Sequence, residues 1–122
     1  MEKENLIDIW DKLESRNHSY WTFFAVTVLA AGGWRLTADG SIHIEERIVM
    51  TAGLLVFLVV NFGFVAGTLT GLEKLKAIIE DTTELDPELA SIVAGCIGKH
   101  RYLGGCLMHA AIDLALLVMI WT

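Results

Sequence analysis

The chain has 122 residues, of which 54% are hydrophobic and 20% charged, with one proline, two cysteines and a net charge of −6. This length corresponds to a single domain, 1–122, and the composition excludes a disordered chain, a collagen-like repeat and a disulfide scaffold. No basic, aromatic-rich stretch points to nucleic acid, which we do not expect as a partner.

The distribution of the charges predicts a membrane protein. Apart from Asp113, every Lys, Arg, Asp and Glu lies in residues 1–16, 35–47 or 73–101. The three intervening blocks would form helices of about 27, 37 and 31 Å, against a hydrocarbon core of about 30 Å. We therefore expect an all-α integral membrane protein with three transmembrane helices. A soluble helical bundle is the alternative, although long uncharged apolar runs are rare in soluble cores.

The first predicted elements are an amphipathic helix over 1–17 and a first span over 18–36. The N-terminal stretch places apolar residues at helical spacing among acidic ones. These apolar residues are Leu6, Ile9, Trp10 and Leu13. The acidic polar face argues against binding to anionic lipid, which attracts Lys- and Arg-rich faces, and favours packing on the cytoplasmic ends of the spans.

The second span is predicted over 45–72, after the turn that Asp39-Gly40 indicates, and its helix continues to about residue 82. Asp86 as N-cap and Pro87 as first helical residue predict a cytoplasmic helix over 87–101, which leads into a third span over 102–121. The second and third helices would then form a long antiparallel hairpin that extends into the cytoplasm. An interruption between Gly98 and Gly105 is the alternative to a continuous helix, because glycine weakens helices.

Lysine and arginine predict the orientation. Seven of them lie in the N-terminal stretch and the 73–101 connection, and only Arg35 and Arg47 lie on the opposite side. The positive-inside rule places the N-terminus in the cytoplasm and the C-terminus at the outer face of the cell membrane.

The second span also predicts a close helix contact. Gly63, Gly67 and Gly71 form two overlapping GxxxG units, which allow another backbone to approach. Packing within the chain and homo-oligomerisation are equally weighted interpretations. Asn61 and Thr68 lie on a different face of this helix, which suggests a second neighbour.

The third span carries the most specific constellation of polar residues. Its members, Tyr102, Cys106, His109 and Asp113, share one helical stripe. Asp113 and His109 lie near the middle of their span, as Asn61 and Thr27 do in theirs. An ionisable group at this depth is costly, so we expect Asp113 to face protein or water.

Three interpretations of these residues compete. They form a proton or cation site, with Asp113 and His109 as the active groups and Asn61 and Thr27 as polar lining. Alternatively, Asp113 and His109 only join helices. A metal site of Cys106, His109 and Asp113 is the weakest of the three, because this spacing is not specific to metal ligation.

We therefore expect a small homo-oligomeric membrane protein that conducts ions or protons. The alternatives are an accessory subunit that docks a larger protein through 1–17 and 73–101, and a metal- or haem-binding membrane protein. Enzymatic activity is not expected, because no set of nucleophile, base and oxyanion donor is recognisable. Membrane lipid is the expected surrounding, and no cofactor is assigned.

Overall fold

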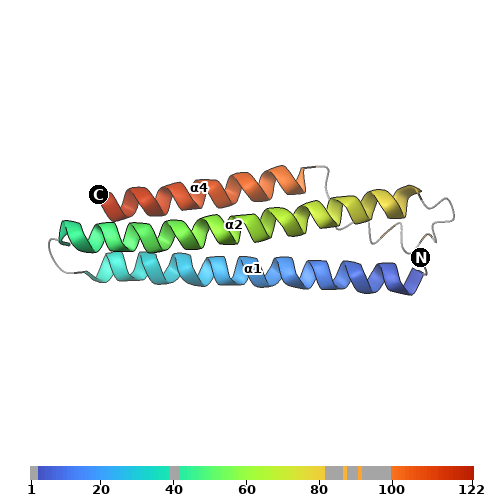
Figure 1. Ribbon diagram of the computed structural model, residues 1–122, viewed down its shortest axis with the longest axis horizontal. Helices are drawn as coiled ribbons and strands as arrows, with labels where there is room; N and C mark the ends of the chain where they lie inside the picture. The colour runs from blue at the N-terminus through green and yellow to red at the C-terminus, as the bar shows by residue number, and fades with distance from the viewer. Residues whose placement is uncertain (1–2, 39–41, 82–86, 88–90, 92–99) are drawn as a thin grey trace.

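The computed structural model describes residues 3–38, 42–81 and 100–122, together with the single positions 87 and 91. These residues form three helices, α1 (Lys3–Thr37), α2 (Ile44–Asp81) and α4 (Arg101–Trp121) (Figure 1). The predicted all-α class is confirmed. α2 runs antiparallel to α1 and α4, and the C-terminus lies at the same end as the connection between α1 and α2.

Two of these helices, α2 and α4, are long and apolar enough to cross a membrane. They have 38 and 21 residues and would measure about 57 and 31 Å. The predicted first span, 18–36, is the C-terminal part of α1 and does not reach the same apolarity, because polar, glycine and tryptophan residues interrupt its apolar run.

The N-terminal segment is not a separate helix. Residues 3–17 and the predicted first span form one continuous helix of 35 residues, because neither proline nor glycine interrupts the chain between them. Leu6 and Trp10 are buried in a cluster with Leu72, Leu75 and Ile79 of α2. This half of α1 therefore packs on protein, and its partner is the C-terminal extension of α2.

The predicted hairpin of the second and third helices is found only in part. α2 and α4 are antiparallel and in contact, but the predicted helix over 87–101 lies almost entirely outside the described residues. α4 begins at Arg101, after a turn in which His100 has φ −119° and ψ 11°. α4 runs through Gly104 and Gly105 without a break, and an interruption before Arg101 stays a prediction because residues 92–99 lie outside the described ranges.

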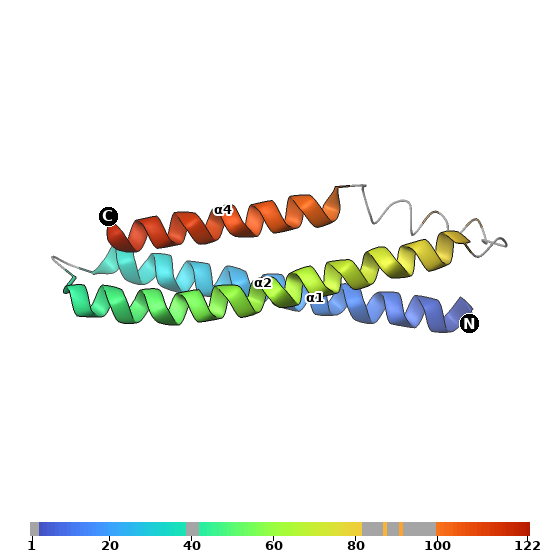
Figure 2. The same cartoon turned by 45° about the horizontal axis from the view of Figure 1, so that its top comes forward.

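The helices enclose two hydrophobic clusters. One joins the N-terminal half of α1 to the C-terminal half of α2, where these two helices reach beyond the start of α4 (Figure 2). The other joins all three helices and includes Phe24, Leu58 and Ile120. α2 contacts both α1 and α4, and α1 also contacts α4.

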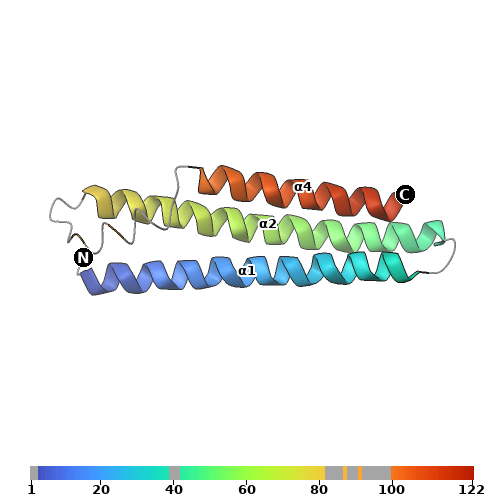
Figure 3. The same cartoon turned by 180° about the vertical axis from the view of Figure 1, so that it is seen from behind.

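Polar contacts join α4 to the other two helices at both ends of the three-helix region. Arg101 at the start of α4 forms a bidentate pair with Glu14 of α1, with N···O distances of 2.5 and 2.8 Å. At the opposite end, Arg35 Nε donates to the backbone oxygen of Met119, and Trp121 Nε1 donates to Thr51 Oγ1. In Figure 3, which shows the structure from behind, α4 lies beside the middle and the N-terminal part of α2.

Candidate functional site

The centre of the three-helix region contains a chain of hydrogen bonds through His109. Asn61 Nδ2 of α2 lies 3.0 Å from His109 Nε2 of α4, and His109 Nδ1 lies 2.8 Å from Asp113 Oδ2. The second contact joins residues four apart on one helix, where side chains meet one turn above one another. His109 has no solvent-exposed surface and Asn61 is 4% exposed. Three residues that the sequence singled out are therefore in direct contact.

The direction of each hydrogen bond follows from the donors present. The Asn61 amide nitrogen can only donate, so His109 Nε2 accepts. A neutral imidazole then carries its proton on Nδ1 and donates it to the Asp113 carboxylate. Asp113 thereby fixes the tautomer and the orientation of the imidazole, and this arrangement can hold and exchange one proton between His109 and Asp113.

Aromatic rings enclose the remaining surface of His109. Phe24 of α1 stacks on the imidazole with ring centroids 3.9 Å apart and an angle of 23°. Trp21 and Phe62 present ring edges or faces at 5.7 and 5.4 Å. The rings exclude water from the hydrogen bonds and strengthen them, because the local dielectric constant is low.

Asp113 connects this centre to the surface between α2 and α4. Its Oδ1 atom is buried and forms no hydrogen bond with the described residues. The same carboxylate borders a cavity of about 270 Å³, whose other lining residues are apolar and include Leu58, Phe62 and Leu117. One oxygen of Asp113 is thus paired with His109, while the other is buried without a hydrogen-bond partner among the described residues.

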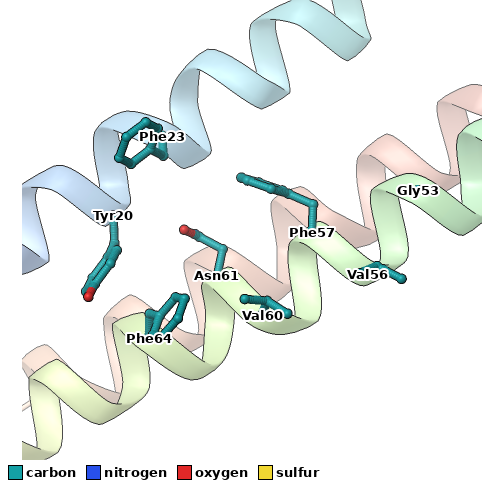
Figure 4. Close-up of a pocket in the computed structure, with 8 residues that line it drawn as sticks. All are labelled: Tyr20, Phe23, Gly53, Val56, Phe57, Val60, Asn61 and Phe64. Atoms are coloured by element: carbon teal, nitrogen blue, oxygen red, sulfur yellow. The ribbon is translucent and has the colours of Figure 1, made fainter.

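Asn61 extends the hydrogen-bonded centre around His109 towards the side of α2 that lies away from the cavity of Asp113. It borders a pocket of about 500 Å³ between α1 and α2, which we call the aromatic pocket. Four aromatic residues line it, namely Tyr20, Phe23, Phe57 and Phe64. Figure 4 shows the amide oxygen of Asn61 directed between Tyr20 and Phe57 into this pocket. His109 therefore joins side chains that face two different cavities.

Thr27 is not part of this arrangement. It borders a separate cavity of about 620 Å³ with Leu54 and Trp34, towards the C-terminal end of α1. The residues of α1 level with His109 are Trp21 and Phe24, about one turn before Thr27. The role of Thr27 as polar lining therefore stays a prediction.

The weak metal assignment receives no support. Within the described ranges, no three His, Cys, Asp or Glu side chains lie together as a metal site would require. His109 and Asp113 are paired, whereas Cys106 is a free, half-buried thiol one turn away. Tyr102, the fourth member of the stripe, is 36% exposed at the start of α4.

The glycine residues of α2 divide into two groups. A Cβ atom on Gly71 would lie 3.6 Å from Leu13 of α1, so this position packs within the chain. Gly63 and Gly67 are exposed, and a Cβ atom on either would meet nothing within 4 Å. Packing within the chain therefore explains only one of the three glycines. Thr68, on the buried face, donates to the backbone oxygen of Phe64.

Sequence reasoning missed the aromatic residues around His109. Trp21, Phe24 and Phe62 were not among its candidate residues. Their only sequence-level indication is that Phe62 adjoins Asn61 and that Phe24 lies three residues after Trp21 on one helix face. Comparison with protein-family models, curated proteins and solved structures finds nothing that matches this chain.

Proposed function

We propose that this chain is a small integral membrane protein that binds protons at mid-membrane depth and passes them across the bilayer as a homo-oligomer. The observation that carries the proposal is the buried chain of hydrogen bonds from Asn61 through His109 to Asp113. Ionisable groups inside apolar helices are costly, and in membrane proteins they mark proton or ion pathways. Two helices with the length and apolarity of a span support the membrane setting.

The chemistry of the centre favours a proton over a metal cation. Cations such as Na⁺ or Ca²⁺ require several oxygen ligands, which replace their hydration shell. The described part of His109's surroundings offers one carboxylate, one amide and aromatic rings. A proton requires only one donor and one acceptor, and the 2.8 Å contact between His109 and Asp113 provides both.

The free surface of α2 supports an oligomer. Gly63 and Gly67 leave a smooth, open ridge on this helix, which suits close approach of a second helix. A neighbouring copy on this ridge would cover the adjacent groove that Asp113 borders. The pathway from Asp113 to the two membrane surfaces would then run between copies of the chain.

Proton flux into proteoliposomes tests the proposal. We expect the purified protein to collapse an imposed pH gradient, and Asp113→Asn to reduce that flux at least tenfold. Asparagine retains an oxygen that accepts from His109 but has no carboxylate to protonate. Thr27→Val is the matched control, because it removes a polar group from α1 that does not contact His109, and its flux should equal that of the wild type.

Absence of flux over several pH values and voltages, with both proteins incorporated equally, would contradict the proposal. It would favour the alternative of a non-enzymatic accessory subunit, in which His109 and Asp113 only join helices.

The oligomer has a separate test. Gly67→Leu should shift the protein from its oligomer to the monomer in cross-linking and light-scattering measurements, because the side chain would separate the two helices. Gly104→Leu is the control, since Gly104 is equally exposed and open but lies on α4. An oligomer that survives Gly67→Leu would exclude this ridge as the interface.

A further inference from the structure

The aromatic pocket has features of a ligand site that proton binding does not use. It lies between α1 and α2, has a volume of about 500 Å³, and is walled by Tyr20, Phe23, Phe57 and Phe64. Small-molecule sites typically have about 300–1,000 Å³, mainly apolar and aromatic walls, and a few polar groups that fix the orientation of the ligand. Phe23 and Phe64 are 64% and 52% exposed, so the pocket opens to the surroundings of the helices.

Besides the hydroxyl of Tyr20, the pocket has a polar group on Asn61, and this amide has a defined direction. Asn61 is 4% exposed, and its amide nitrogen is occupied by His109. Its amide oxygen points into the pocket, between Tyr20 and Phe57, and forms no hydrogen bond with the described residues (Figure 4). Because His109 holds the amide in this orientation, the pocket presents a hydrogen-bond acceptor and no donor from Asn61.

We propose that the aromatic pocket binds a lipid-soluble phenol, an aromatic ring that carries a hydroxyl group. The ring would stack among the four aromatic side chains, and the hydroxyl would donate to Asn61 Oδ1. Tyr20 and Phe64 stack on each other, with centroids 5.1 Å apart and an angle of 12°, so part of the pocket wall is a preformed aromatic pair. An acceptor at the base of an apolar pocket selects a ligand with a donor, since an unpaired buried polar group is unfavourable.

This site does not depend on proton movement. The phenol approaches from the α1 side of α2, whereas Asp113 faces the cavity between α2 and α4. The two are connected only through His109, which contacts both Asn61 and Asp113.

The experiment measures saturable binding of 1-naphthol to the full chain in lipid nanodiscs, with empty nanodiscs as the reference for partitioning into lipid. We expect 1-naphthol to bind about five- to tenfold more tightly than naphthalene, because only the former donates a hydrogen bond to Asn61. We also expect it to bind more tightly than 2-decalol, a saturated two-ring alcohol, because the walls are aromatic. Equal affinity of 1-naphthol and naphthalene, or uptake that does not exceed that of empty nanodiscs, would overturn the proposal.

A pair of adjacent valines locates the site. Val60 lines the aromatic pocket, whereas Val59 lines the cavity on the other side of α2, and both are exposed. Val60→Trp should reduce 1-naphthol affinity at least tenfold by filling the pocket, and Val59→Trp should leave it unchanged. Equal effects of the two variants would overturn the assignment to this pocket.

A further variant tests the hydrogen bond itself. Asn61→Leu should remove the preference for 1-naphthol over naphthalene while retaining some affinity for both rings. Because the readout is a ratio of two ligands on the same variant, a general loss of folded protein does not imitate it. A preference that persists in Asn61→Leu would show that another group accepts the hydroxyl and would overturn the role of Asn61.

Discussion

At the scale of single residues, His109 joins all three helices. It extends from α4, accepts from Asn61 of α2 and stacks on Phe24 of α1. A histidine can do this because its ring offers two nitrogen atoms in the plane and two apolar faces. The residue therefore contributes to the packing of all three helices, and this role requires a different measurement from the proposed proton binding.

The structural role of His109 predicts a large loss of stability on truncation. His109→Ala would leave Asn61 and Asp113 without their partner and open a cavity beside Phe24. We expect the free energy of unfolding in detergent to fall by about 3 kcal/mol or more. Met108→Ala provides the control, because Met108 precedes His109 and is 53% exposed. Similar losses for both variants would show that His109 is not a packing centre.

Contacts of His109 within its own helix could be predicted from the sequence, whereas its contacts with the other helices could be predicted only in part. The pairing of His109 with Asp113 follows from their spacing of four residues on a helix. Asn61 was a candidate partner because it lies near the middle of its own apolar segment. Thr27 was the residue expected from α1, whereas Phe24 is the residue of α1 that stacks on His109. Relative helix register depends on side-chain packing between helices, which hydropathy does not encode.

A second residue-scale prediction concerns the two adjacent glycines of α4. A Cβ atom on Gly105 would lie 3.2 Å from Leu69 and 3.8 Å from Trp21, whereas a Cβ atom on Gly104 would meet nothing within 4 Å. Gly105→Leu should therefore destabilise the fold by about 1–3 kcal/mol through overpacking. Gly104→Leu should be neutral or stabilising, because glycine is unfavourable inside a helix. Thermal unfolding of both variants in detergent checks the difference, and equal midpoints would contradict the close approach of α4 to α2.

At the scale of the helices, polar contacts at the two ends fix how α4 aligns with α1. The Arg101–Glu14 pair lies near the start of α4, and the bond from Arg35 to Met119 O lies near its end. Arg35 also lies in the last turn of α1, where a cation interacts favourably with the helix dipole. Because these contacts are about one helix length apart, they prevent α4 from sliding along α1.

A double-mutant cycle measures the first of these contacts. Both side chains of the Arg101–Glu14 pair are 29% exposed, and the geometry is bidentate. We expect a coupling energy of about 1 kcal/mol between Glu14→Gln and Arg101→Gln, which decreases at high salt. The Lys12–Asp8 pair, with side chains 65% and 60% exposed, is the comparison and should couple more weakly. Equal coupling energies in the two pairs would contradict the prediction that partial burial strengthens the Arg101–Glu14 pair.

The helices themselves were partly predictable. The charge-poor block at 48–72 lies in α2, and the block at 102–122 lies in α4 except for its last residue. The boundary between 1–17 and 18–36 was not found, since a change in composition does not end a helix when no breaking residue is present. The Glu14–Arg101 pair could not be predicted either, because its members are 87 residues apart.

At the scale of the whole molecule, the two hydrophobic clusters suggest two environments. The cluster shared by all three helices lies between α1 and the apolar parts of α2 and α4, which are long and apolar enough to cross a membrane. The other cluster lies where α1 and α2 continue past the start of α4, and charged residues such as Asp8, Lys12 and Glu73 are exposed there. We expect this second part to project into the cytoplasm, because it carries most of the Lys and Arg residues.

Cysteine labelling in intact cells tests this arrangement. In a background with Cys96→Ala and Cys106→Ala, single cysteines would replace Glu4, His43 or Asp81, which are all exposed. His43→Cys should react with a membrane-impermeant maleimide from outside, whereas Glu4→Cys and Asp81→Cys should react only after permeabilisation. This pattern follows because α1 and α2 run in opposite directions (Figure 1), while Glu4 lies in the first turn of α1, Asp81 ends α2 and His43 directly precedes α2. Labelling of Glu4→Cys and His43→Cys from the same side would show that α1 does not cross the bilayer, and recovery of the protein in the soluble fraction would exclude the membrane setting altogether.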